Sequence, residues 1–163
     1  SLYLAKIALE KRQGNYDQAR LIVAQALQKF PKSPKLWSEN IRLLPSKKSS
    51  LKKTMFQDAL RNTNNSCQVL IEIGVSFYQD SQYATASKWF ERATKSSKLY
   101  GDGWVWLTRC LEKLNKNYDY CYEKVADHEP IYGEEWISIS KNIQTQYSTP
   151  SEILGILVRH NQI

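Results

Sequence analysis

Large apolar residues recur along this chain at an almost constant interval. Tyr3, Trp37, Leu70, Trp104 and Trp136 are separated by 34, 33, 34 and 32 residues. Periods of roughly 20 to 50 residues are typical of repeat architectures, in which one small unit of secondary structure stacks on the next. The interval therefore indicates a repeat fold before any other property of the chain is considered.

The segment 67–100 shows what one unit contains. Each half has apolar or small residues at positions i, i+3, i+4 and i+7, which lie on one face of an α-helix. These residues are Leu70, Ile73, Gly74 and Phe77 in the first half, and Ala86, Trp89, Phe90 and Ala93 in the second. Helices this short are not stable alone in water, so each must bury its apolar face against a neighbour. The pattern predicts a repeating pair of antiparallel helices.

Small residues and prolines complete the unit. Gly74, Ala86 and Ala93 are expected to let paired helices approach closely, which would offset the cost of a glycine inside a helix. Pro31 and Pro130 are expected to separate units, because proline cannot continue a helix. Near the end of the sequence, Thr-Pro-Ser-Glu at 149–152 predicts a helix start with a capping threonine and a proline in the first turn.

The segment LEKRQGNYDQARLIVAQALQKFP, residues 9–31, resembles the HAT repeat, a relative of the tetratricopeptide (TPR) repeat. We therefore predict an all-α fold, a right-handed α-solenoid of antiparallel helix pairs with about four to five HAT/TPR-like repeats. We expect a single domain over 1–163. Its units are predicted at 1–34, 35–66, 67–100, 101–131 and 132–163. In the second unit the polar segment PSKKSS separates the two helices and lacks the turn glycine of the first unit.

Histidines and cysteines, which often act in catalysis or metal binding, are few in this sequence and lie far apart. His128 and His160 match no metal-binding spacing, and Cys67, Cys110 and Cys121 contain no CxxC pair. Nucleotide-binding and zinc-hydrolase motifs are absent from the sequence. We predict no catalytic residue, no metal, no cofactor and no enzymatic activity. The cysteine pattern suggests a reducing compartment, and no apolar run reaches the roughly 20 residues that a membrane span needs.

The charge is unevenly distributed. Residues 1–66 hold 13 lysines and arginines against 4 acids, whereas residues 67–163 hold 10 against 12. Candidate contacts with RNA or an acidic partner are the lysines at 29–53, namely Lys29, Lys32, Lys35, Lys47, Lys48, Lys52 and Lys53. A merely solvated surface is the alternative explanation of these lysines. Lysine contacts to phosphates would be weak and independent of RNA sequence.

The last third of the chain resembles a narrower family. The string comprises Asp102, Trp104, Glu112, Glu129, Pro130, Gly133, Glu134, Trp136, Ser140 and Lys141. It is similar to the C-terminal end of the pre-mRNA-processing factor 6 family. The resemblance implies the C-terminal part of a longer repeat array in a nuclear splicing scaffold. Its implied partners are proteins of the U5 and U4/U6 snRNPs, which that family bridges within the tri-snRNP during spliceosome assembly.

Two alternatives to a protein-binding scaffold stay open at this point. One is an RNA-contacting HAT module of another RNA-processing complex, which would use the lysines of residues 29–53. The other is self-association through the ends of the array. The anchors Tyr3, Trp37, Leu70, Trp104 and Trp136 are predicted to be core residues of successive helix pairs. The alternative is that one of them is exposed and stacks on a ligand or on RNA.

Overall fold

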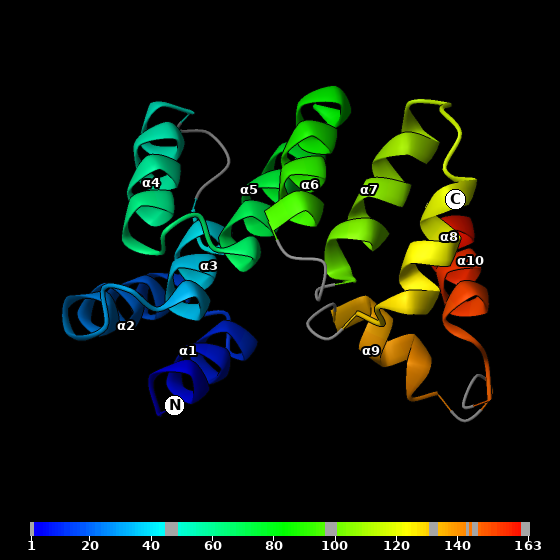
Figure 1. The fold of residues 1–163 in the computed structure, drawn as a ribbon. Coiled ribbons are helices and arrows are strands. Elements are labelled where there is room, and N and C mark those ends of the chain that lie inside the picture. The colour runs from blue at the N-terminus through cyan, green and yellow to red at the C-terminus, as the bar shows by residue number, and fades with distance from the viewer. Residues whose placement is uncertain are drawn as a thin grey trace. The chain divides into compact units, whose positions relative to one another are not determined.

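The computed structural model describes residues 2–44, 49–96, 101–130, 134–142, 144 and 147–160. Within those ranges the chain forms ten α-helices and no β-strand (Figure 1). The prediction of an all-α fold built from helix pairs is confirmed. No helix within these ranges combines the length and the apolar character needed to cross a membrane.

The internal contacts of the chain divide it into two compact units, 1–76 and 77–163. The helices of unit 1 are α1 (Leu2–Arg12), α2 (Tyr16–Lys29), α3 (Pro34–Arg42), α4 (Ser49–Asn62) and the greater part of α5 (Cys67–Gln79). Unit 2 holds the end of α5, then α6 (Tyr83–Ser96), α7 (Asp102–Lys113), α8 (Asp119–Asp127), α9 (Glu134–Ser140) and α10 (Pro150–His160). The sequence analysis predicted a single domain of five repeats that follow a superhelical course. These two features stay predictions.

Unit 1 is organised around the apolar face of α2. Ala19, Val23 and Ala26 follow one another at helical spacing and are fully buried. They form a core with Ile7 of α1 and Leu36 of α3. Burying a valine or isoleucine side chain contributes about 1.5–3 kcal/mol, so α2 holds its two neighbours mainly through this face. In chain order α1 packs on α2, α2 on α3, and α3 on α4.

The same turn ends three helices that open predicted units. Gly14 after α1, Ser81 after α5 and Asn115 after α7 have φ of 78°, 61° and 55°. In each turn the next residue donates its N–H to a carbonyl five positions back: Asn15 to Glu10, Gln82 to Phe77 and Lys116 to Leu111, all at 2.9 Å. This is the Schellman arrangement, which satisfies the last carbonyls of a helix. Ser81 and Asn115 are 34 residues apart, so the turn repeats with the period of the sequence.

Unit 2 has a core shared by α7, α8, α9 and α10. Val105, Val125, Trp136 and Leu154 represent these four helices in one buried cluster. The helix α10 packs on α7, α8 and α9. Its start is confirmed, because the Thr149 hydroxyl accepts a hydrogen bond from the N–H of the third helical residue at 3.3 Å.

Two glycines bring the elements of unit 2 together. A Cβ at Gly103 would lie 3.2 Å from Cγ2 of Thr94 and 3.7 Å from Cβ of Ala93, so the absent side chain lets α7 approach α6. A Cβ at Gly101 would lie 1.9 Å from the carbonyl oxygen of His128 and 2.9 Å from the nitrogen of Pro130. The start of α7 therefore sits directly against the backbone that follows α8.

Candidate functional site

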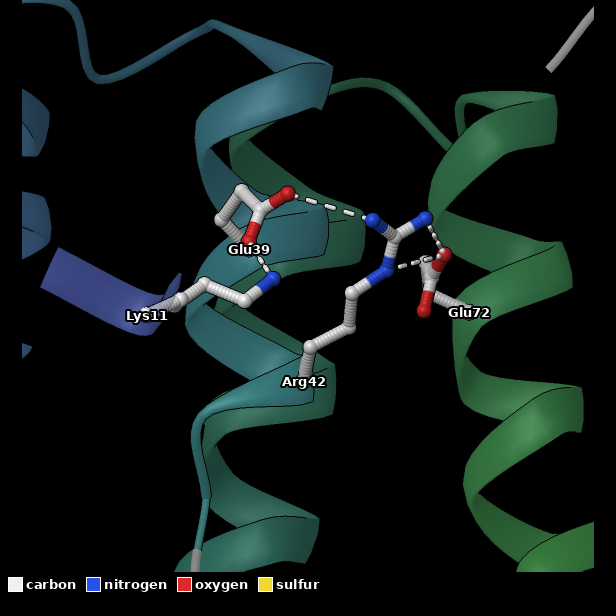
Figure 2. Close-up of polar contacts among 4 residues, drawn as sticks. All are labelled: Lys11, Glu39, Arg42 and Glu72. Atoms are coloured by element: carbon white, nitrogen blue, oxygen red, sulfur yellow. Dashed lines mark hydrogen bonds and ion pairs between the residues drawn. The ribbon is translucent and has the colours of Figure 1, made fainter. Parts of the chain in front are cut away.

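Charged side chains join three helices of unit 1. Lys11 of α1 contacts Glu39 of α3 with 3.0 Å between Nζ and Oε2. Arg42, also on α3, contacts Glu39 with 3.1 Å between Nη1 and Oε1, and contacts Glu72 of α5 through Nε and Nη2 at 2.8 and 2.5 Å. Figure 2 shows that the four side chains form a continuous row. We call these four residues the charge ladder.

The ladder is partly withdrawn from solvent. Glu72 is 8% exposed, whereas the side chain of Arg42 is 37% exposed. Burial raises the pKa of Glu72, and the hydrogen bond from Arg42 opposes this rise without cancelling it. Such a pair adds little net stability, because desolvation offsets much of the attraction, but removing one partner leaves a costly buried charge. The ladder therefore fixes which residues of α1, α3 and α5 face one another.

Unit 2 has aromatic contacts that join α7 to α6 and to the end of α5. Trp106 of α7 stacks on Phe90 at 5.8 Å and meets Tyr78 edge-on at 5.4 Å. The guanidinium of Arg109 lies over the Trp106 ring at 4.6 Å. Burial raises the pKa of the Tyr78 hydroxyl above its ordinary value. We call these four residues the Trp106 cluster.

The sulfur groups of the chain are poorly suited to catalysis. Cys67, Cys110 and Cys121 are buried free thiols. Burial raises the pKa of Cys110 to about 12 and also raises that of Cys121, which leaves little of the reactive thiolate. Among the described residues, no group of three or more potential ligands could hold a metal ion.

The predicted repeat anchors have different environments. Leu70, Gly74, Ala86, Ala93, Pro130 and Trp136 are buried, and Tyr3, Trp37 and Trp104 are half-buried. Trp104 packs against the core cluster that contains Trp136. The indole N–H of Trp37 donates to the carbonyl of Pro31 at 2.7 Å and so braces the α2–α3 turn. Their role as anchors of each repeat stays a proposal.

The lysines of residues 29–53, predicted to contact RNA or an acidic partner, lie on different elements. Lys29, Lys32 and Lys35 are exposed around the α2–α3 turn. Lys52 and Lys53 lie on α4, where the former is half-buried. Lys47 and Lys48 lie outside the described residues. The charge ladder could not be predicted from the sequence, because Lys11 and Glu39 are 28 residues apart and Arg42 and Glu72 are 30 residues apart.

Comparison with known proteins identifies the family. The family described as "PRP6, TPR-like domain" matches residues 1–158 of this chain. The chain belongs to this PRP6 TPR-like family. The predicted resemblance is thus confirmed, and it covers far more than the last third of the chain.

Two PRP6-like relatives are similar over most of the chain. Pre-mRNA-splicing factor 6 of Saccharomyces cerevisiae is 56% identical over 153 residues, which are 93% of this chain and 17% of that protein. Pre-mRNA-splicing factor prp1 of Schizosaccharomyces pombe is 34% identical over 161 residues, which are 96% of this chain and 17% of that protein. The PRP6-like chain therefore spans about a sixth of the length of these relatives.

A solved structure supports the fold alone. YrrB, a TPR protein with an unusual peptide-binding site, aligns with 98% of this PRP6-like chain and 84% of its own chain at a TM-score of 0.52. The identity is 14%, so the likeness concerns the arrangement of helices and not the ligand.

Proposed function

We propose that this chain is a non-catalytic protein-interaction scaffold that acts in pre-mRNA splicing in the nucleus. The observation that carries the proposal is its 56% identity, over 93% of its length, to a yeast pre-mRNA-splicing factor. The finer role follows the family resemblance. This segment helps to bridge the U5 and U4/U6 snRNPs in the tri-snRNP by contacting their proteins.

The side chains described above suit binding without covalent chemistry. Helix repeats present a row of first helices to a partner, and a few aromatic or arginine residues supply most of the affinity in such surfaces. The charge ladder holds α1, α3 and α5 in one register, and the Trp106 cluster, in which Arg109 is buried, orders α7 against α6 and the end of α5. A surface ordered before binding loses less conformational entropy when the partner docks.

A segment exchange in yeast tests this proposal. The homologous segment of Saccharomyces cerevisiae Pre-mRNA-splicing factor 6 is replaced by this chain. We expect growth and the tri-snRNP band on native gels to persist. Affinity-purified chimera should still recover U5 and U4/U6 proteins after nuclease treatment, which removes contacts made only through RNA.

A fold-matched control separates sequence from architecture. The same segment is replaced by the repeats of YrrB, which share the fold at 14% identity. We expect this control to lose the tri-snRNP. If the YrrB chimera works equally well, the proposed contact surface is wrong. Failure of both chimeras, with normal protein levels, would also contradict the scaffold function of this segment.

Self-association through the ends of the array is a separate prediction about partners. Sedimentation at two protein concentrations distinguishes it, because only an associating chain increases its sedimentation coefficient with concentration.

A further inference from the structure

A group of cations and aromatic rings lies where the start of α1 meets the end of α2. The rings of Tyr3 and Phe30 meet edge-on at 6.2 Å, and the Nζ of Lys29 lies 5.7 Å from the Tyr3 ring centroid. Lys6 is one helical turn after Tyr3 on α1. Lys32 and Lys35 follow Phe30 in the α2–α3 turn and in the first turn of α3. We call these six residues the basic-aromatic patch.

All members of the patch except the half-buried Tyr3 are open to solvent. Phe30 is 54% exposed, and the four lysines are exposed as well. Within the part of the chain that the structure describes, none of these lysines forms a salt bridge, whereas Lys11 and Arg42 of the same unit do. The patch therefore carries a concentrated positive charge that the described acids do not neutralise.

Local structure keeps this charge in place. The Tyr3 hydroxyl lies beside the ammonium group of Lys29, and their hydrogen bond raises the pKa of Lys29 above its ordinary value. Lys35 occupies the first turn of α3, and that turn holds no acidic residue that could neutralise it. A cation at a helix N-terminus is unfavourable for the helix dipole, so helix stability does not explain this lysine. The N–H of Ser33 donates to the carbonyl of Phe30 at 3.2 Å and closes the turn. Trp37 braces the same turn through the carbonyl of Pro31.

We propose that the basic-aromatic patch binds single-stranded RNA, with a base stacked on Phe30 and phosphates beside Lys29, Lys32 and Lys35. Exposed aromatic rings flanked by cations are the usual platform for single strands, because every base has a flat face and every nucleotide a phosphate. Charge alone would also suit an acidic protein, but an exposed ring fixed among lysines favours the nucleic acid. This binding does not depend on the proposed scaffold function.

Fluorescence anisotropy of the whole chain with a labelled oligouridine of about 12 nucleotides tests the proposal. The triple reversal K29E/K32E/K35E should weaken binding more than about tenfold. It should also flatten the salt dependence between roughly 50 and 200 mM salt, because fewer counterions are released. The matched control K88E/K95E/K116E makes the same change of charge at exposed lysines of unit 2 and should have a much smaller effect.

Variants of Phe30 test the stacking. Phe30→Leu keeps an apolar contact with Tyr3 but removes the flat ring, and it should weaken RNA binding about tenfold. Phe30→Trp should bind at least as tightly as the parent chain. Leu21→Ala, at an exposed apolar residue of α2 outside the patch, is the control and should bind normally. Circular dichroism establishes that each variant is folded.

Three results would overturn the proposal. The first is the absence of salt-dependent RNA binding by the folded parent chain. The second is an equal loss in both triple variants, which would mean a general effect of charge. The third is competition by polyglutamate as strong as that by RNA, together with normal binding by Phe30→Leu, which would assign the patch to an acidic protein.

Discussion

The two units of this chain join their first helices by different chemistry. In unit 1, ion pairs link α1, α3 and α5 through Lys11, Glu39, Arg42 and Glu72. In unit 2, Trp106 of α7 meets Tyr78 at the end of α5 edge-on and stacks on Phe90 of α6. Both units nevertheless derive from the same period in the sequence.

The difference shows what a repeat period does and does not specify. The period fixes where helices begin and end, and the same turn closes α1, α5 and α7. It leaves open how neighbouring repeats recognise one another. Ion pairs select a register at little net gain in stability, whereas apolar and aromatic burial supplies stability with less selectivity. Unit 1 should therefore be more sensitive to the loss of a charge, and unit 2 to a change of shape.

The largest expected effect is steric and concerns unit 2. Gly101→Ala places a methyl group 1.9 Å from the His128 carbonyl oxygen, between two backbone segments that cannot both stay in place. We expect the free energy of unfolding to fall by about 3 kcal/mol, as for severe overpacking. Chemical denaturation measures this change.

Gly155→Ala is the matched control for that substitution. A Cβ at Gly155, inside α10, meets no atom within 4 Å. This variant should be stabilised by about 0.5–1 kcal/mol, because alanine is the better helix former. Equal effects at the two glycines would refute the close approach of α7 to the segment after α8.

The next effect concerns the charge ladder. Arg42→Ala leaves the Glu72 carboxylate buried without its guanidinium partner. We expect a loss of about 2–3 kcal/mol, less than for a fully buried pair because Arg42 is partly exposed. The double variant R42A/E72Q should recover about half of this loss, and a double-mutant cycle gives the coupling. Strictly additive effects would show that the pair is not coupled.

A smaller effect is the pH dependence caused by Glu72. Its pKa is raised in the folded chain by burial, against the attraction of Arg42 and, more weakly, Lys11. The folded state thus binds more protons than the unfolded state, so stability from this group falls as pH rises from about 4.3 through the raised value. The unfolding free energy of the parent chain, minus that of Glu72→Gln, should therefore decrease as pH rises in that window. If the parent chain instead gains stability over Glu72→Gln as pH rises, the attraction of Arg42 outweighs burial and the net pKa of Glu72 is lowered.

The smallest effect tests the repeated turn. Ser81 has a φ of 61°, which costs a residue with a side chain more than it costs glycine. Ser81→Gly should stabilise the chain by about 1 kcal/mol, while Asn115→Gly should change stability less, because asparagine tolerates this conformation. Thermal unfolding of the two variants measures the difference, and destabilisation by Ser81→Gly would contradict the turn geometry.

The sequence predicted the elements that depend on local patterns. Helical spacing around Ala86 and Ala93, and the cap at Thr149, are set by residues within one or two turns. These features required no knowledge of neighbouring repeats. The helix pairs and the family could therefore be predicted from residues alone.

The contacts between repeats could not be predicted in the same way. Arg42 and Glu72 are 30 residues apart, and their contact depends on how α3 faces α5. The exposure of Trp37, and the burial of Arg109 to 6%, depend equally on the packing of adjacent helices. No local sequence pattern indicates which residue of a neighbouring helix a charged or aromatic side chain will contact.

The most direct test of this account is amide hydrogen exchange, measured peptide by peptide. It compares the parent chain with Arg42→Ala and Gly101→Ala, and it shows whether unit 1 depends on charge contacts and unit 2 on close apolar packing. We expect Arg42→Ala to accelerate exchange in α1, α3 and the start of α5, and Gly101→Ala to accelerate it in α7 and α8. If each variant instead accelerates exchange equally in both units, the assignment of charge contacts to one and close apolar packing to the other is wrong.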